Sequence, residues 1–213
     1  MMDAPTIDFS NQKVLEILAA VKSVFASKGF DGASMQDLAQ AAQMSVGNFY
    51  RYFPSKNAII QAMVQLDMDG LEAEFAEIEC AEDPRAVFLA KLSNHIENLS
   101  NEEAALWTEI QAASFRVPEI AEVKRKMERT IRERIIRALV RIDGGTSDAD
   151  IARYEQHTHL ILLMLHGFAQ RRYCALDKNP EADKALGQLV FKTLRLAFEA
   201  SAIIKSDEEV HSK

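Results

Sequence analysis

The sequence contains few residues that interrupt helices, with only 5 prolines and 8 glycines among 213 residues. Long helices need few such residues, so this scarcity favours an all-α fold over a turn-rich β fold. Hydrophobic residues make up 48% of the chain, which is enough for a packed core and excludes a disordered protein. The length fits one ordinary domain, or a small module joined to a larger one.

Cysteine patterns and long apolar runs are also missing. Cys80 and Cys174 lie far apart, which supports neither a disulfide framework nor a zinc ribbon. The most apolar run, from Leu160 to Leu165, is far shorter than the roughly 20 residues that cross a bilayer. No basic segment followed by an apolar stretch marks a signal peptide at the start. We therefore expect a cytoplasmic protein without metal, cofactor or membrane partner.

The charge balance gives no general sign of nucleic-acid binding, because the formal net charge is −7. Acidic and basic residues cancel over residues 1–56, so the negative excess lies after residue 56. From Asp67 to Asp83 every charged residue is acidic. Such a charge distribution affects the solubility of the protein and the rate at which charged partners approach it, but it does not indicate the fold.

Apolar spacing and helix-terminating residues predict about nine helices. Gly29 ends the first helix, Ser34 with Asp37 forms a capping-box variant at the start of the second, and Pro54 ends the third. The predicted ranges are 11–28, 35–42, 46–52, 56–79, 84–100, 102–116, 118–142, 148–176 and 180–203. We predict an all-α fold in which a three-helix module (1–56) is joined by a long helix to a larger helical bundle (57–205), followed by a polar tail (206–213).

The second and third helices have the spacing of a helix-turn-helix. Ala39 is small where the two helices must cross, and Met44 in the turn can fill the space beneath them. Phe49 and Phe53 are four residues apart, so they share one face of the third helix and can anchor it in the core. The residues left to point outward, toward the major groove of DNA, are Val46, Gly47, Asn48, Tyr50 and Arg51.

The stretches 29–42 (GFDGASMQDLAQAA) and 44–56 (MSVGNFYRYFPSK) resemble the DNA-binding signature of the TetR family of repressors. The resemblance covers roughly residues 11–60. It implies that Ser34 and Tyr50 contact phosphates and that Gly47 and Asn48 read bases. It also implies that Lys56 binds a phosphate at the start of the fourth helix, where a cation and the helix dipole act together.

Two positions depart from the family pattern. Gln43 stands in the turn where glycine is common, and a left-handed backbone there would cost about 1 kcal/mol. Val46 stands where lysine is common, so it can pack against a thymine methyl group but cannot neutralise a phosphate. Arg51 fits a solvated surface charge as well as a DNA contact, and Tyr50 and Tyr52 could instead be core aromatics whose hydroxyls reach solvent.

The family resemblance also implies a homodimer that binds a double-stranded, pseudo-palindromic operator and is released by a small-molecule effector. Helix-turn-helix proteins dimerise to reach two half-sites, and the last helix carries a broad apolar stripe. The predicted dimer interface is Leu186, Leu189, Val190, Thr193, Leu194, Ala197 and Phe198.

An effector pocket is harder to predict, since its candidate residues also suit an ordinary core. The candidates are Phe88, His95, Trp107, Ile110, Phe115, Met164, His166 and Phe168. For each one alone, packing is the simpler explanation, and a histidine on an apolar face is more often hydrogen-bonded in the core than bound to a ligand.

Two other functions compete with a ligand-responsive repressor. A di-iron enzyme on a helical bundle needs paired Glu-x-x-His motifs, but only Glu208 to His211 fits. The sequence also has no nucleophile–base pair or phosphate-binding glycine loop, so we expect no enzymatic activity. The basic residues of 118–142 could instead bind an acidic partner, although their spacing among glutamates suits a solvated face.

Overall fold

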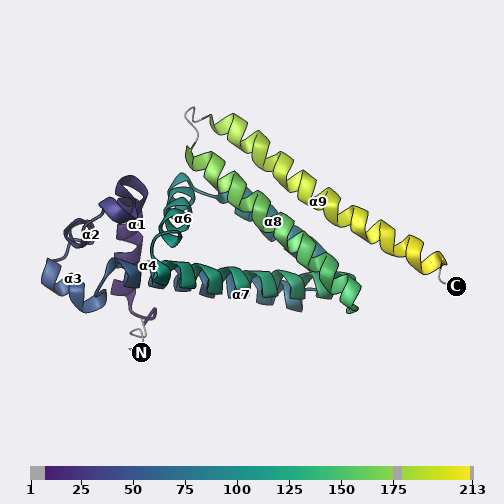
Figure 1. Cartoon of the computed structure of the whole chain (residues 1–213), viewed down its shortest axis with the longest axis horizontal. Helices are drawn as coiled ribbons and strands as arrows, with labels where there is room; N and C mark the ends of the chain where they lie inside the picture. The colour runs from purple at the N-terminus through teal and green to yellow at the C-terminus, as the bar shows by residue number, and fades with distance from the viewer. Residues whose placement is uncertain (1–7, 175–178, 212–213) are drawn as a thin grey trace. The chain divides into compact units, whose positions relative to one another are not determined.

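The computed structural model describes residues 8–174 and 179–211, with side chains as far as Glu199. In these ranges the chain forms nine helices and no strand (Figure 1). They are α1 (Gln12–Gly32), α2 (Met35–Ala41), α3 (Val46–Tyr52), α4 (Lys56–Cys80), α5 (Pro84–Asn98), α6 (Asn101–Ser114), α7 (Pro118–Asp143), α8 (Asp148–Cys174) and α9 (Pro180–His211). The predicted all-α class is confirmed.

Capping residues explain where several helices begin. The Ser34 side chain accepts a hydrogen bond from the Asp37 amide, and the Asp37 side chain accepts one from the Ser34 amide, which is the predicted capping box. Ser45 caps α3, and Ser100 with Glu103 forms a second capping box at α6. These groups satisfy backbone amides that the first turn of a helix leaves without partners.

The last helix is longer than the sequence pattern predicted. α9 continues to His211, eight residues beyond the predicted end at 203, and so includes most of the predicted polar tail. Residues 201–211 contain neither glycine nor proline, so no helix-breaking residue ends α9 earlier. Residues 212–213 lie outside the described part of the chain.

The helices pack as two compact units. Unit 1 comprises residues up to Glu72 together with Ser100–Glu128, and unit 2 comprises Ala73–Leu99 together with the chain from Arg129 onward. This grouping does not coincide with the predicted division at residue 56, because α6 and the start of α7 pack with the N-terminal helices. The reason is that α1 lies along α6, a neighbour more than 70 residues away in the sequence.

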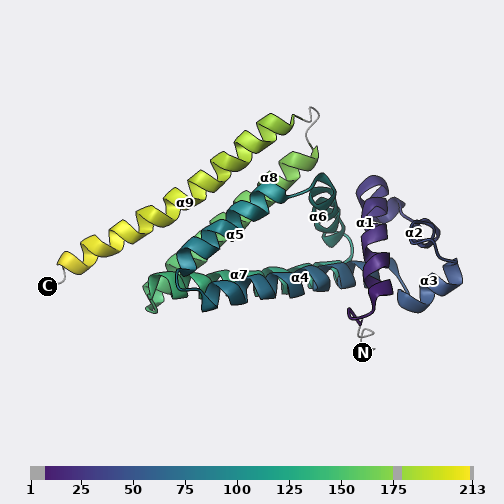
Figure 2. The same ribbon diagram turned by 180° about the vertical axis from the view of Figure 1, so that it is seen from behind.

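Each unit has its own core. In unit 1 the side chains of Ile17, Leu18, Val21 and Phe25 are fully buried, and the ring of Phe25 stacks on Phe30 with centroids 6.1 Å apart. In unit 2, α9 packs against α5 and runs back alongside α8 (Figures 1 and 2).

A glycine permits the close approach of α9 to its neighbours. A Cβ atom added at Gly187 would lie 3.1 Å from Ile96 of α5 and 3.3 Å from Phe168 of α8. The small residue therefore lets α5, α8 and α9 pack closely at this point.

Gln43, in the turn between α2 and α3, has the left-handed backbone conformation considered from the sequence, with φ of 55°. We expect Gln43→Gly to stabilise the protein by about 1 kcal/mol, because glycine adopts this conformation without a steric penalty. Thermal unfolding should then shift upward by about 2–4 °C. Gln40→Gly is the matched control: Gln40 is helical, so the same change there should lower the melting temperature. Equal shifts in both variants would contradict the assignment of strain to Gln43.

Candidate nucleic-acid interface

The helix α3 is anchored by two buried aromatic rings and presents its other side chains to solvent. Phe49 and Phe53 are completely buried, with ring centroids 6.1 Å apart. Val46 and Tyr50 are 37% and 47% exposed although both are largely apolar. Gly47, Asn48 and Arg51 are also exposed. The predicted orientation of α3 is confirmed, and the five outward residues form one surface, which we call the α3 face.

The α3 face combines hydrogen-bonding groups with small and apolar ones. Asn48, Arg51 and the half-buried Tyr52 border an open hollow of about 300 Å³. In the described part of the chain, the side chains of Asn48 and Arg51 make no hydrogen bond or ion pair. An amide and a guanidinium of this kind can pair with adenine and guanine edges in a major groove.

Ser34, the predicted phosphate contact, is exposed but already engaged in its own helix. Its hydroxyl donates to Asp37 Oδ2 at 2.7 Å and accepts from the Asp37 amide at 3.1 Å. The ammonium of Lys28 lies 2.6 Å from the other oxygen of Asp37 and, with Ser34, holds the pKa of that carboxyl far below its ordinary value. A phosphate at this end of α2 would therefore meet an ionised carboxylate beside the serine.

Lys56 also has partners within the protein. Its ammonium donates to the carbonyl oxygens of Phe30 at 2.7 Å and Asp31 at 3.3 Å, and it lies 4.8 Å from the centroid of the Phe30 ring. An ammonium has three N–H donors, so two internal bonds leave one for a phosphate. The internal role of Lys56 could not be predicted from local sequence patterns, because Phe30 and Lys56 are 26 residues apart.

The salt dependence of DNA binding distinguishes the two roles of Lys56. We expect Lys56→Met to weaken binding to all duplexes and to reduce the slope of log affinity against log salt by about one unit per subunit. Lys91→Met, which removes the same charge from unit 2, is the control. A loss of affinity with an unchanged slope, measured by fluorescence anisotropy at several salt concentrations, would assign Lys56 only to the internal bonds.

The eight predicted effector residues are not gathered at one place. Trp107, Ile110 and Phe115 belong to unit 1, and Phe115 is 79% exposed. The remaining five belong to unit 2, where His95 and His166 are exposed, Met164 is half-buried, and Phe88 and Phe168 are buried. Only Phe88 borders the cavity described next, and the assignment of the other residues stays a prediction.

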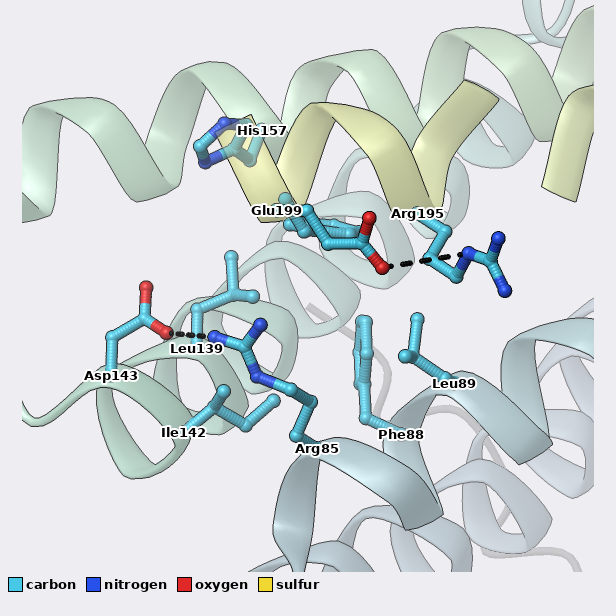
Figure 3. A pocket seen from close by; sticks show the side chains of 10 residues that line it. Arg85, Phe88, Leu89, Leu139, Ile142, Asp143, His157, Arg195 and Glu199 are labelled. Atoms are coloured by element: carbon cyan, nitrogen blue, oxygen red, sulfur yellow. Dashed lines mark hydrogen bonds and ion pairs between the residues drawn. The ribbon is translucent and has the colours of Figure 1, made fainter. Parts of the chain in front are cut away.

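A cavity enclosing about 50 Å³ lies in unit 2 between α5, α7, α8 and α9 (Figure 3). Its aromatic side is formed by Phe88 and Phe198, whose rings meet edge to face with centroids 5.9 Å apart. The ion pair between Arg85 and Asp143 borders it, with 3.0 Å between the charged atoms. The complete lining is Arg85, Phe88, Leu89, Leu139, Ile142, Asp143, His157, Arg195, Phe198 and Glu199.

His157 adds a neutral polar group to this cavity. Its ring centroid lies 5.3 Å from that of Phe198. Burial, assisted by the nearby Arg153, lowers the pKa of His157, and Asp143 opposes the shift. A neutral imidazole has one N–H donor and one acceptor nitrogen. Sequence reasoning missed most of the lining because residues such as Arg85 and Asp143 look like ordinary surface charges.

The predicted dimer residues point in different directions. Val190 and Leu194 are buried within the protomer, while Leu189 is 59% exposed and Thr193 is also exposed. Leu186, Ala197 and Phe198 are half-buried. Two further leucines are strongly exposed on the same pair of helices: Leu163 on α8 and Leu196 on α9. The structure describes one chain, so the interface itself stays a prediction.

The described residues offer neither a cluster of metal ligands nor a membrane-spanning helix. No group of three or more histidine, cysteine, aspartate or glutamate side chains there is arranged to hold a metal ion. None of the described helices is both long and apolar enough to cross a membrane.

Residues 17–63, which contain α2, α3 and the start of α4, match the model of the bacterial regulatory proteins of the tetR family. The N-terminal part of the chain therefore carries a DNA-binding segment of the TetR family. The chain is 33% identical over 121 residues to the HTH-type transcriptional regulator UidR of Escherichia coli K12. The aligned residues make up 55% of this chain and 59% of UidR. The chain thus aligns with about three-fifths of the length of this curated relative.

Solved structures extend the likeness in fold to most of the chain. GusR of Salmonella enterica matches with a TM-score of 0.67 and 21% identity, over 91% of this chain and 98% of GusR. A transcriptional regulator from Saccharomonospora viridis, crystallised in complex with choline, matches with a TM-score of 0.65 and 14% identity, over 84% of this chain and 95% of that one. At these identities the comparisons establish the fold.

Proposed function

We propose that this TetR-family protein is a homodimeric transcriptional repressor that binds a specific DNA operator through α3. The observation that carries the proposal is the α3 face itself. Buried Phe49 and Phe53 hold a short helix whose Asn48 and Arg51 side chains are exposed and free of partners within the described chain. Curated relatives such as UidR are transcriptional regulators, which supports regulation of genes over catalysis.

Release by a small-molecule effector is part of the proposal. The cavity of unit 2 encloses about 50 Å³, far less than the roughly 300–1,000 Å³ of typical small-molecule pockets. An effector of ordinary size must therefore separate the surrounding helices, and a ligand that binds the separated arrangement better shifts the protein toward it. Two half-sites lie about 34–36 Å apart, so a modest change in the spacing of the two α3 helices would lower operator affinity.

DNA binding is tested directly by a fluorescence-anisotropy titration against the DNA upstream of the protein's own gene, with a scrambled duplex as control. We expect tight, salt-dependent binding to the first and weak binding to the second. Equal binding would place the operator elsewhere. Absence of binding to both duplexes at low salt would contradict the proposed function and favour a protein-interaction role for the basic side chains of α7.

A single substitution tests base recognition by Asn48. We expect Asn48→Ala to weaken operator binding by about 1–3 kcal/mol, because a bidentate contact to a base edge is lost, and to affect random DNA much less. Gln36→Ala, on the exposed side of α2, is the control for removal of a side-chain amide. Equal losses of Asn48→Ala on operator and random DNA would mean that Asn48 does not read sequence.

A further inference from the structure

The α1 helix bends sharply just before the helix-turn-helix, and this bend leaves a backbone amide in need of a partner. Gly29 has φ of 72° and ψ of 169°, which ends the regular turns of α1. We call Gly29–Ala33 the α1 bend. The next residue, Ser34, caps α2, so the geometry of the α1 bend determines the direction in which α2 and then α3 continue.

A carboxylate from α6 supplies the missing partner. Glu109 is half-buried, and its Oε2 accepts a hydrogen bond from the Phe30 amide at 3.1 Å. The fit is close, since a Cβ atom added at Gly29 would lie only 2.9 Å from the same oxygen. Hydrogen bonds from an amide to a charged carboxylate are stronger than those between neutral groups.

Two cations hold the neighbouring groups of the bend. Arg116, just after α6, contacts Asp31 with 2.7 Å between the charged atoms and also donates to the Ala112 carbonyl. Lys56, at the start of α4, donates to the carbonyls of Phe30 and Asp31. The amide, the carbonyl groups and the acidic side chain of this short segment are therefore each bound by a residue outside α1 and α2.

We propose that Glu109 is a positioning residue for DNA binding: its carboxylate fixes the α1 bend and thereby sets the orientation of α2 and α3. The inference rests on the proposed function and extends it. Because the acceptor belongs to α6, a shift of α6 breaks the Phe30–Glu109 bond and lowers DNA affinity without any change in the α3 face.

The test compares two substitutions at Glu109 with one nearby. Glu109→Met removes the acceptor at similar volume, whereas Glu109→Gln keeps a carbonyl oxygen that can accept from Phe30. Glu102→Met, at an exposed α6 position, is the matched control. Each full-length variant is titrated against the duplex that the wild type selects from a random library, and amide hydrogen exchange of the segment containing Phe30 is followed.

Glu109→Met is expected to weaken operator binding and to speed exchange of the Phe30 amide, each by about tenfold. Glu109→Gln should stay close to the wild type, and Glu102→Met should match it. If Glu109 had a purely structural role, Glu109→Met would have a lower melting temperature but unchanged operator affinity when measured about 20 °C below that temperature. This result would overturn the inference.

A second variant keeps the test decisive if Glu109→Met does not fold. Arg116→Gln removes the exposed ion pair with Asp31 and should weaken binding by about twofold to threefold. If Glu109→Met does not fold and Arg116→Gln binds the operator with wild-type affinity, the inference is overturned. If the wild type selects no duplex, the proposed function itself is overturned. If the wild type binds DNA and Glu109→Met binds it equally well, only the role assigned to Glu109 is contradicted.

Discussion

Leu189→Glu is expected to convert the protein to a monomer and to lower its operator affinity by about 100-fold or more. Leu189 on α9 is 59% exposed, and Leu163 on α8 and Leu196 on α9 are 71% and 49% exposed. Large exposed leucines on two adjacent helices indicate a surface that a partner covers. Two linked half-site contacts raise affinity by about 10²–10⁴ over one, so loss of the dimer removes that gain.

The control for this prediction is Gln188→Glu, which introduces the same acidic group one residue away at another exposed position. Size-exclusion chromatography with light scattering measures the oligomeric state, and anisotropy measures affinity on the same samples. A Leu189→Glu protein that remains dimeric and binds operator like the wild type would rule out α9 as the interface.

Gly47→Ala is expected to change stability and DNA binding in opposite directions: the protein should become more stable and its operator affinity should fall. Apart from the adjacent residues and the backbone of its own helix, no heavy atom lies within 4 Å of a Cβ placed at Gly47, so the fold accepts the methyl group. Alanine is a better helix former, which should stabilise α3 by up to about 1 kcal/mol. If the backbone at Gly47 lies against base edges, the same methyl group blocks that approach, and operator affinity should fall by about tenfold or more.

Gly70→Ala provides the matched comparison for Gly47→Ala. Gly70 lies in the interior of α4, and an added Cβ there would again meet no heavy atom within 4 Å outside the adjacent residues and the helix's own backbone. It should raise the melting temperature and leave DNA binding unchanged. A Gly47→Ala protein with both a higher melting temperature and wild-type affinity would show that the DNA backbone and bases do not approach this residue.

Local signals allowed the fold and the α3 face to be predicted closely. The end of α3 follows from Pro54 just after it, and the exposure of its face follows from the four-residue spacing of Phe49 and Phe53. Each of these signals acts within a few residues, so the sequence alone contains them. The left-handed backbone of Gln43 was considered on another ground, because glycine is common at this turn position in the family that the sequence resembles.

Features that join distant parts of the chain could not be predicted in the same way. Phe30 and Glu109 are 79 residues apart, and no periodic pattern connects an amide to a carboxylate at that distance. The cavity of unit 2 escaped prediction for a related reason, since its ion pairs look like solvated charges until the helices are packed. Apolar residues such as Trp107 and Phe88 looked equivalent in sequence, yet they belong to different units.

Selection from a random-sequence duplex library with the purified full-length protein tests the central claim most directly. The account predicts enrichment of a two-fold symmetric sequence whose half-sites are centred about one helical turn, or a multiple of it, apart. It also predicts that the Asn48→Ala protein loses this enrichment. A library that is retained without any enriched sequence, or not retained at all at low salt, would contradict the conclusion that α3 reads DNA as part of a dimer.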